Sequence, residues 1–393
     1  LKRAGEKGEG KWQIISWDQA IEEISSKLKN LRDKYGSETL ATSSGTGRTH
    51  DEYRSRFMNL FGTPNNIGQG QICYGPGMMI CGALAGWPYY YPAVRPGKTM
   101  CLLLIGTNPE QQSRRLWYAI LEAQKLGAKL IVIDPRRTIT AERADLFLQP
   151  RPGTDGALLM GMINIIIKEG LHDRDFIERW GYGFDKFAAR AAEYPLSKVA
   201  EITWVPEEKI AAAAGMYATI KPAHIIHGMG LEHLANSIEI LHARYSMTAM
   251  TGNIDIRGGE LMRGHHPSII SEFETEMNEA MPEEQKKKQV GIDKFRLQSW
   301  IGYDMIRENT QKIHGGMYAR YHCAFSHTPQ VYRAMLTGKP YPVRALFTMA
   351  SNPMVTQANT KMVHRAIKNL DLYVVLEFWK TPSAELADYL LPG

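Results

Sequence analysis

Apolar residues recur at helical spacing near the start of the chain. Five of them lie three or four positions apart and so share one helix face: Ile21, Ile24, Leu28, Leu31 and Tyr35. Ser16 followed by Gln19 is a capping-box pattern, and Gly36 is a residue type that commonly ends helices. This pattern predicts a helix over 17–35.

Short, continuously apolar runs alternate with helical segments along the rest of the chain. The run 101–105 is apolar at every position, which is typical of a strand buried on both faces of a parallel sheet. The same reading predicts further strands at 39–43, 129–134, 223–227, 343–349 and 372–376, and helices at 109–126, 155–169, 206–219, 232–251 and 359–370. The alternation predicts an α/β fold of doubly wound, mostly parallel sheets.

Two segments interrupt this alternation. Residues 63–97 are rich in Gly, Pro, Asn, Gln and Tyr and are too long for a simple connection, so we expect a functional loop there. Residues 278–296 carry runs of glutamate and lysine, and we interpret them as a solvated insertion or helix face.

Composition narrows the classes of protein. The 393 residues are 44% hydrophobic and 22% charged, as in globular proteins of two or three domains. The net charge of +6 comes from scattered basic residues, which argues against nucleic-acid binding, and no apolar run reaches the ~18 residues of a membrane span. The ends, Leu1 and Gly393, suggest a piece of a longer chain, so the sequence leaves the compartment open.

Small and amide residues follow three of the predicted strands. These residues are Gly106-Thr107-Asn108-Pro109, Gly228-Met229-Gly230 and Ser351-Asn352-Pro353. Ligands of α/β proteins bind at the carboxyl ends of parallel strands, where helix amino termini favour anions. Ordinary tight turns are the alternative for each segment taken alone. The GxGxxG spacing of NAD-binding proteins is absent from the sequence.

A second group of polar residues has the chemistry of a nucleotide pocket. Asp134 offers a carboxylate to a ribose or a guanine edge, Arg136 a guanidinium to pyrophosphate, and Thr138 a hydroxyl. Gly153 and Asp155 then open a predicted helix. A turn and a helix cap are the alternative interpretation.

Taken together, these segments identify a resemblance that covers nearly the whole chain. The sequence resembles the molybdopterin oxidoreductases of the dimethyl sulfoxide reductase and formate dehydrogenase superfamily. The matching segments, in the order of the family, are Ile15–Ala20, Phe61–Asn65, Ile105–Pro109, Asp134–Thr138, Ala144–Asp145, Arg151–Asp155, Thr251–Ile254, Ser351–Pro353 and Ala387–Pro392.

The resemblance implies molybdenum or tungsten held between two molybdopterin guanine dinucleotides. It assigns one dinucleotide to Gly106, Asn108, Asp134, Arg136, Thr138, Gly153 and Asp155, beside Gly228 and Gly230, and the other to Asn352, Glu377 and Thr381. The family more often has Asp at the position of Glu377 and Thr at that of Ser383. A 4Fe-4S cluster is expected on a domain absent from this chain.

The family's metal ligand lies in a loop where this chain has Cys73. A thiolate suits molybdenum or tungsten, whereas a lone cysteine taken by itself is more often a small buried hydrophobic residue. Cys81 and Cys101 are assigned to packing. Arg263 and His265 fall near an active-site arginine of related enzymes, where they would stabilise an anion and shuttle a proton; a surface turn is the alternative.

The position of the ligand loop divides the chain into two expected domains. Residues 69–265 would form one α/β domain with the ligand loop and the first dinucleotide site. Residues 1–68 and 266–393 would form a discontinuous second domain with the other site.

The implied function is the catalytic core of an enzyme of two-electron redox chemistry on a small substrate: oxygen or sulfur atom transfer, or dehydrogenation. Tyr74 stands where formate dehydrogenases have His, which disfavours formate, and residues 194–203 and 341–345 resemble the branch with acetylene hydratase and related anaerobic enzymes. A non-redox hydratase and a catalytically silent subunit remain alternatives. The expected partners are the enzyme's remaining domains and an electron-transfer subunit.

Overall fold

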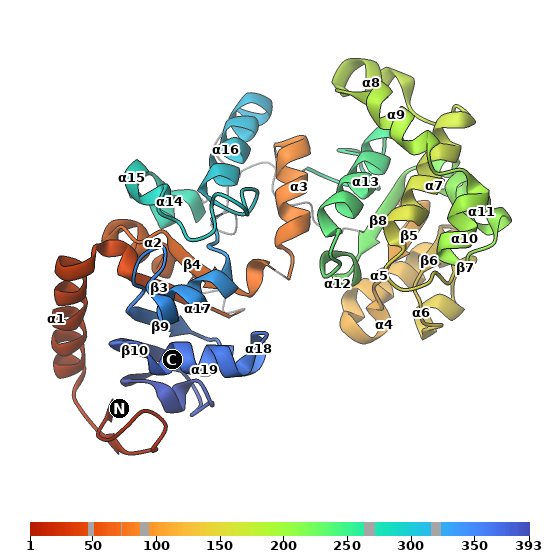
Figure 1. The fold of residues 1–393 in the computed structure, drawn as a ribbon. Coiled ribbons are helices and arrows are strands. Elements are labelled where there is room, and N and C mark those ends of the chain that lie inside the picture. Colours follow the sequence, from red (N-terminus) through yellow and green to blue (C-terminus); the bar gives the residue numbers. More distant parts are fainter. Residues whose placement is uncertain (46–50, 72, 87–93, 263–271, 316–323) are drawn as a thin grey trace. The chain divides into compact units, whose positions relative to one another are not determined.

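The computed structural model divides the chain into two compact units, which are described separately (Figure 1). The structure describes residues 1–45, 51–71, 73–86, 94–262, 272–315 and 324–393. Unit 1 consists of Leu1–Gln71 with His265–Gly393, and unit 2 is Ile72–Gly264. The domain boundaries expected from the sequence, 68 and 265, stay a prediction.

Unit 1 is built on a seven-stranded sheet of order β2-β1-β11-β10-β9-β3-β4. Strands β11, β10, β9, β3 and β4 are parallel, and only the short β1 and β2 are paired antiparallel. The strands are β1 (Lys2–Arg3), β2 (Trp12–Gln13), β3 (Leu40–Ser44), β4 (Asn65–Gly68), β9 (Ala345–Met349), β10 (Leu372–Glu377) and β11 (Tyr389–Pro392). The helices are α1 (Trp17–Tyr35), α2 (Asp51–Phe61), α14 (Glu272–Glu276), α15 (Glu283–Lys286), α16 (Trp300–His314), α17 (Thr328–Thr337), α18 (Pro353–Thr356) and α19 (Thr360–Lys368).

Both faces of this sheet are covered, because successive side chains of a strand point to opposite sides. Leu372 and Val374 of β10 pack with Leu28 of α1, whereas Tyr373 and Val375 pack with α17 and α19. Continuous apolar strands therefore form two cores in one unit, as expected of a doubly wound sheet.

Unit 2 is built on a four-stranded parallel sheet of order β7-β6-β5-β8. Its strands are β5 (Cys101–Ile105), β6 (Lys129–Ile133), β7 (Leu146–Leu148) and β8 (Ala223–His227). Its helices are α3 (Gly75–Ala85), α4 (Pro109–Gln112), α5 (Arg114–Lys125), α6 (Ile139–Glu142), α7 (Asp155–Lys168), α8 (Arg174–Trp180), α9 (Phe184–Ala192), α10 (Leu196–Thr203), α11 (Glu207–Thr219), α12 (Met229–Glu232) and α13 (Ser237–Met250). The predicted α/β class with parallel sheets is confirmed.

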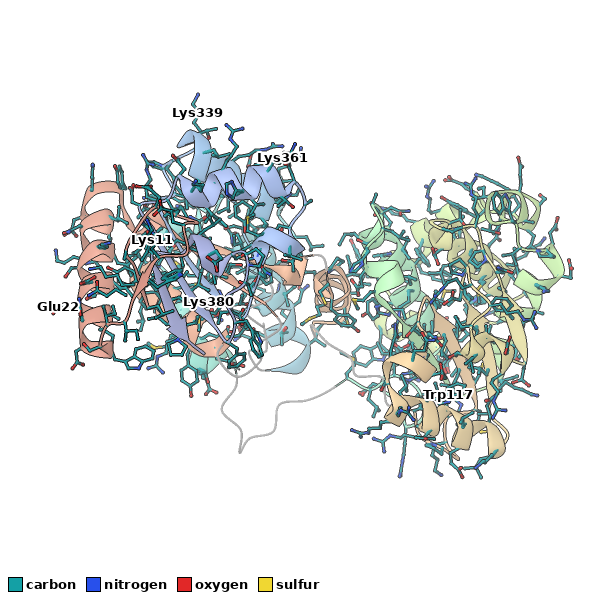
Figure 2. The ribbon with its side chains drawn as sticks, turned by 90° about the horizontal axis from the view of Figure 1, so that it is seen from below. Lys11, Glu22, Trp117, Lys339, Lys361 and Lys380 are labelled. Atoms are coloured by element: carbon teal, nitrogen blue, oxygen red, sulfur yellow. The ribbon has the colours of Figure 1, made fainter. Side chains whose placement is uncertain are left out.

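Charged side chains of the two units are exposed to solvent, as expected for amphipathic helices whose apolar faces pack on a sheet. Lys11, Glu22, Lys339, Lys361 and Lys380 are exposed and are labelled on the ribbon in Figure 2. Within the residues that the structure describes, no helix has both the length and the apolar character of a membrane span.

Three predicted elements need correction. The helix expected over 109–126 is two helices, because Ser113 leaves the helical conformation and caps α5 through the N–H of Leu116. The long segment 63–97 contains β4 and α3. The charged segment 278–296 is only partly solvated, since Lys286 is buried beside Trp300 and Val290 belongs to the unit 1 core.

Candidate functional site

The carboxyl ends of the four parallel strands of unit 2 meet at one edge of its sheet. The loop after β5 carries Gly106 and Asn108, Asp134 follows β6, and the loop after β8 begins at Gly228. The N–H of Gly106 donates to Ile133 of β6 at 2.9 Å, so the first two loops start side by side. The structure thus brings together segments that are more than 120 residues apart in sequence.

Glycine is required where the loops after β5 and β8 touch. A Cβ on Gly228 would come closer to the carbonyl oxygen of Gly106 than real Cβ atoms come to backbone. Gly106 itself has φ +57°, in the left-handed region that glycine adopts without strain, and it lies against Gly230. The absence of three side chains lets the two loops pack backbone against backbone.

Asn108 forms a turn that is held by a hydroxyl group. Its buried amide oxygen accepts the hydroxyl hydrogen of Thr140 at 2.6 Å, and Pro109 then starts α4. Thr140 was not among the predicted site residues, and its only signal in the sequence is its closeness to Thr138 in the Asp134–Thr138 segment.

The same turn occurs in unit 1 after β9. Asn352 has φ −120° and ψ 73°, against −123° and 80° for Asn108, and each is followed by proline and one helical turn. The amide oxygen of Asn352 accepts the hydroxyl of the fully buried Ser383 at 2.7 Å. Each asparagine is therefore positioned by a hydroxyl residue more than 30 positions away in sequence, Thr140 of α6 and Ser383 in the segment after β10.

At the unit 2 edge, one carboxylate lies within the electrostatic influence of another. Desolvation by burial, followed by the negative charge of Asp134, raises the pKa of Asp155 above its ordinary value of 3.8. Asp134 is buried and accepts the backbone N–H of Arg136 at 2.7 Å. Within the described part of the chain, neither carboxylate forms an ion pair. This arrangement favours a ligand that brings hydrogen-bond donors.

The remaining predicted residues of the first site lie in the segments after β6 and β7 at the same edge of the sheet. The Arg136 side chain is exposed, the hydroxyl of Thr138 caps α6 by accepting from Ala141, and Gly153 has φ +83° directly before α7. Nothing within 4 Å would obstruct a side chain at Gly153, so backbone conformation alone requires glycine there.

Glu377 is the last residue of β10, and Thr381 lies in the loop that follows it, next to the Asn352 turn. Glu377 accepts the N–H of Phe378 at 2.8 Å, and the hydroxyl of Thr381 accepts the N–H of Ala384 at 3.2 Å. Ser383, which positions Asn352, follows Thr381 by two residues in this loop. The three predicted residues of the second site are thus brought to one edge of the unit 1 sheet.

Cys73 lies immediately before α3 and is partly buried. Its Sγ is 3.9 Å from Sδ of Met229, the first residue of α12. Cys81 and Cys101 are buried, and burial raises the pKa of each thiol to about 12. Their assignment to packing agrees with this burial, and Cys73 is the more accessible of these three thiols.

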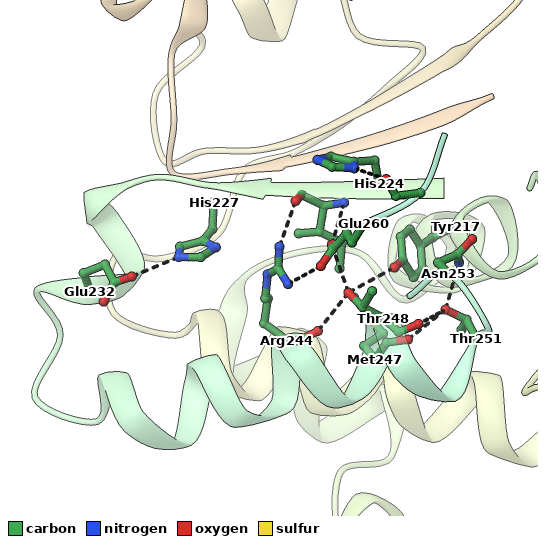
Figure 3. A network of polar contacts seen from close by, with 12 residues as sticks. Tyr217, His224, His227, Glu232, Arg244, Met247, Thr248, Thr251, Asn253 and Glu260 are labelled. Carbon is green, nitrogen blue, oxygen red and sulfur yellow. Dashed lines mark hydrogen bonds and ion pairs between the residues drawn. The ribbon is translucent and has the colours of Figure 1, made fainter. Parts of the chain in front are cut away.

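A buried polar network supports the end of β8 near Cys73 (Figure 3). Arg244 of α13 donates to Glu260 at 2.7 Å and to the carbonyl of Ile225 at 2.8 Å. At the end of the strand, His227 donates to Glu232 at 3.0 Å, and burial lowers the pKa of His227. This pair was not predicted, because no motif spacing in the sequence links His227 to Glu232.

Arg263 and His265, the other predicted catalytic residues, lie outside the described residues. Within the described ranges, no group of three or more His, Cys, Asp or Glu side chains is arranged to hold a metal ion.

Comparison with known proteins gives the family. The model of the molybdopterin oxidoreductase family matches residues 1–393, and the chain belongs to that family. It is 39% identical over 398 residues to acetylene hydratase from Syntrophotalea acetylenica, covering 100% of this chain and 54% of the relative. Formate dehydrogenase H from Escherichia coli is 28% identical over 395 residues, covering 98% and 52%.

A solved structure has the same fold. Acetylene hydratase from Pelobacter acetylenicus matches with a TM-score of 0.92 and 37% identity, over 100% of this chain and 54% of that one. The chain spans about half the length of the relatives that it matches. Membership of the family implies molybdenum or tungsten with molybdopterin, and the resemblance predicted from the sequence is confirmed.

The residues present fit such a cofactor. The glycine-lined edge offers backbone donors. Asp134, which is buried, and Asp155, which is partly buried, form no ion pairs among the described residues and offer acceptors. The thiol of Cys73 offers a soft ligand.

Proposed function

We propose that this chain is the cofactor-binding core of a larger molybdenum or tungsten enzyme. One molybdopterin guanine dinucleotide would bind at the edge of each sheet, and Cys73 would ligate the metal. The observation that carries this proposal is the repeated turn, because Asn108 and Asn352 have nearly the same backbone angles and each accepts a buried hydroxyl. Two equivalent turns suit two copies of one ligand.

At the first site, Asp155 and Asp134 would accept hydrogen bonds from guanine N–H and ribose hydroxyl groups. Such donors stabilise carboxylates that otherwise repel each other in a desolvated edge. Arg136 is exposed and free to turn toward pyrophosphate, while Gly106, Gly153, Gly228 and Gly230 would keep this edge free of side chains, and the hydroxyl of Thr138 lies at the same edge. At the second site, Asn352, Glu377 and Thr381 would bind the other dinucleotide.

Cys73 would supply the protein's ligand to the metal as a thiolate. When bound, the metal and its pterins provide the reactive centre, and the chain provides ligation, orientation and exclusion of water. Arg263 and His265 stay proposed catalytic residues, for an anion and a proton. The enzyme's remaining domains would carry a 4Fe-4S cluster, and an electron-transfer subunit is an expected partner.

Two reactions fit this core. Two-electron redox chemistry is common to the reductases and dehydrogenases among its relatives, such as formate dehydrogenase H and the thiosulfate reductase subunit of Salmonella typhimurium. Hydration of a small unsaturated substrate is favoured by the 39% identity to acetylene hydratase over the whole chain. Turnover of acetylene without any electron acceptor would identify the hydratase; turnover that depends on an acceptor would identify redox chemistry.

The core proposal is tested on the purified full-length protein. Elemental analysis should detect molybdenum or tungsten, and acid hydrolysis should release two guanine nucleotides per metal. X-ray absorption should count one fewer metal–sulfur contact in Cys73→Ser than in the unaltered protein. A protein that contains neither metal nor guanine nucleotide would instead support the catalytically silent subunit.

A further inference from the structure

The loop that carries Cys73 is fixed to the end of β8 by two contacts within unit 2. The ring of Tyr74 stacks on that of His227, with centroids 5.7 Å apart and planes 2° apart. The sulfur of Cys73 lies 3.9 Å from that of Met229, the first residue of α12 and two residues after His227. The position of Cys73 therefore depends on residues of the β8–α12 segment.

A third contact comes from a carboxylate on α12. Helix α3 starts at Gly75, and Tyr74 at its N-cap provides no side-chain hydrogen bond to the helix. Glu232 takes this role, because it accepts the N–H of Gly77 at 2.8 Å. The first turn of α3 is thus capped by a residue 155 positions away in sequence.

Glycine at position 77 is what allows this cap. A Cβ on Gly77 would come closer to the Glu232 carboxylate than real Cβ atoms come to any atom. The other oxygen of this carboxylate accepts from His227 at 3.0 Å (Figure 3). His227 is also the residue on which Tyr74 stacks. One carboxylate therefore links the start of α3 with the histidine beneath the ligand loop.

Burial gives this link its rigidity. The side chain of His227 is 1% exposed and that of Glu232 is 0% exposed. A buried carboxylate is costly unless its oxygens are hydrogen-bonded, and here both of them are. Moving the loop would break at least one of these bonds in a site that water does not reach.

We propose that Glu232 is a positioning residue for the metal ligand: through Gly77 and His227 it holds the loop so that the thiolate of Cys73 keeps one orientation. The inference rests on the proposed function, which makes Cys73 the ligand. The negative charge of Glu232 also lies at the positive end of the α3 dipole, so this helix end is already neutralised in part.

The first measurement needs no cofactor. In cofactor-free full-length protein, alkylation of Cys73 by iodoacetamide, followed on its own peptide by mass spectrometry, should be about fivefold faster in Glu232→Ala, the factor expected for losing a helix cap. Glu232→Gln keeps an acceptor for Gly77 and should restore the rate to within about twofold. In Gly77→Ala the added methyl group would displace the Glu232 carboxylate by steric contact, so this variant should also accelerate alkylation of Cys73.

A matched control separates positioning from general instability. Val199→Ala removes buried volume from α10, far from the ligand loop in sequence, and should leave the Cys73 rate unchanged. In the loaded enzyme, the metal–sulfur contact from Cys73 should be lost or spread over several distances in Glu232→Ala and kept in Glu232→Gln.

Failure of this inference and failure of the proposed function give different results. Unchanged alkylation and an unchanged metal–sulfur contact in both Glu232→Ala and Gly77→Ala would overturn the positioning role and leave the ligand role intact. An unchanged sulfur count in Cys73→Ser would overturn the ligand role, whatever Glu232 does.

Discussion

The negative charge of Asp134 acts on the carboxyl group of Asp155 across the strand ends of unit 2, where it adds to burial in raising the Asp155 pKa. In the unfolded chain this pKa has its ordinary value of 3.8. The native state therefore binds more protons in the pH range from 3.8 up to the raised value, and stability is lost as the pH rises through that range.

The first prediction follows for Asp155→Asn. This change removes the desolvated charge, so cofactor-free protein at pH 7 should melt about 1–3 °C higher and lose that part of its acid-side pH dependence. The same variant should retain less guanine nucleotide, because the amide presents a donor where the ligand needs an acceptor. Differential scanning calorimetry from pH 4 to 8 and nucleotide analysis measure the two effects.

The exposed Asp185 in the first turn of α9 provides the control for this experiment. Asp185→Asn should change neither nucleotide content nor the pH dependence attributed to Asp155. A lower melting temperature for Asp155→Asn than for the unaltered protein would contradict the prediction.

Much of the fold could be predicted where local pattern and tertiary burial agree. The helix at 17–35 and the strands at 101–105 and 223–227 have the bounds expected from the sequence. Strand β4 was missed because Asn65 and Asn66 have low strand propensity; tertiary contacts stabilise it, since Asn65 bonds the carbonyl of Glu38 and Asn66 accepts from the buried Arg54.

The site could be predicted only as far as its residues follow strands directly. Asn108 and Asp134 stand at strand ends, where the alternation of elements already places ligands. Thr140 and Ser383 act through hydrogen bonds to distant loops, and Glu232 acts through the backbone of Gly77. No local pattern signals such partners, because their function depends on tertiary distance.

The second prediction concerns the glycine contact between the loops after β5 and β8. Gly228→Ala should lower the free energy of unfolding by about 1–3 kcal/mol, because its Cβ would collide with the rigid carbonyl of Gly106. Gly215→Ala in α11, with open space around the added methyl, should instead raise it by about 0.5–1 kcal/mol. If urea unfolding gave the same change in the free energy of unfolding for Gly228→Ala and Gly215→Ala, the two loops would be able to move apart without cost.

The third prediction concerns the hydroxyl that holds Asn108. Thr140→Val keeps the shape of this buried side chain but removes its hydroxyl group, so the amide oxygen of Asn108 loses the hydrogen bond that it accepts from Thr140. We expect a loss of about 1–2 kcal/mol in stability and a lower cofactor content. The matched variant Thr219→Val, at the exposed end of α11, should change stability by less than about 0.5 kcal/mol and leave cofactor content unaltered. Normal cofactor content in Thr140→Val would show that Asn108 needs no support.

The last prediction tests whether the second turn acts independently of the first. Ser383 donates its hydroxyl to Asn352 at 2.7 Å and accepts the N–H of Met354 at 3.0 Å, so Ser383→Ala leaves both groups without this partner. If each unit binds its own dinucleotide, this variant should lower the guanine nucleotide released per metal from two toward one. Thr140→Val should do the same from the other unit.

Ser383→Thr separates the hydroxyl from the size of the side chain. It keeps the donor, and the family more often has threonine there, so it should retain more nucleotide than Ser383→Ala despite the full burial of the site. Ser25→Ala on the exposed face of α1 is the control, since its hydroxyl bonds only the local carbonyl of Glu22, and it should leave the ratio unchanged. A nucleotide ratio of two in Ser383→Ala would mean that Asn352 positions no ligand, and the equivalence of the two turns would then be one of backbone shape alone.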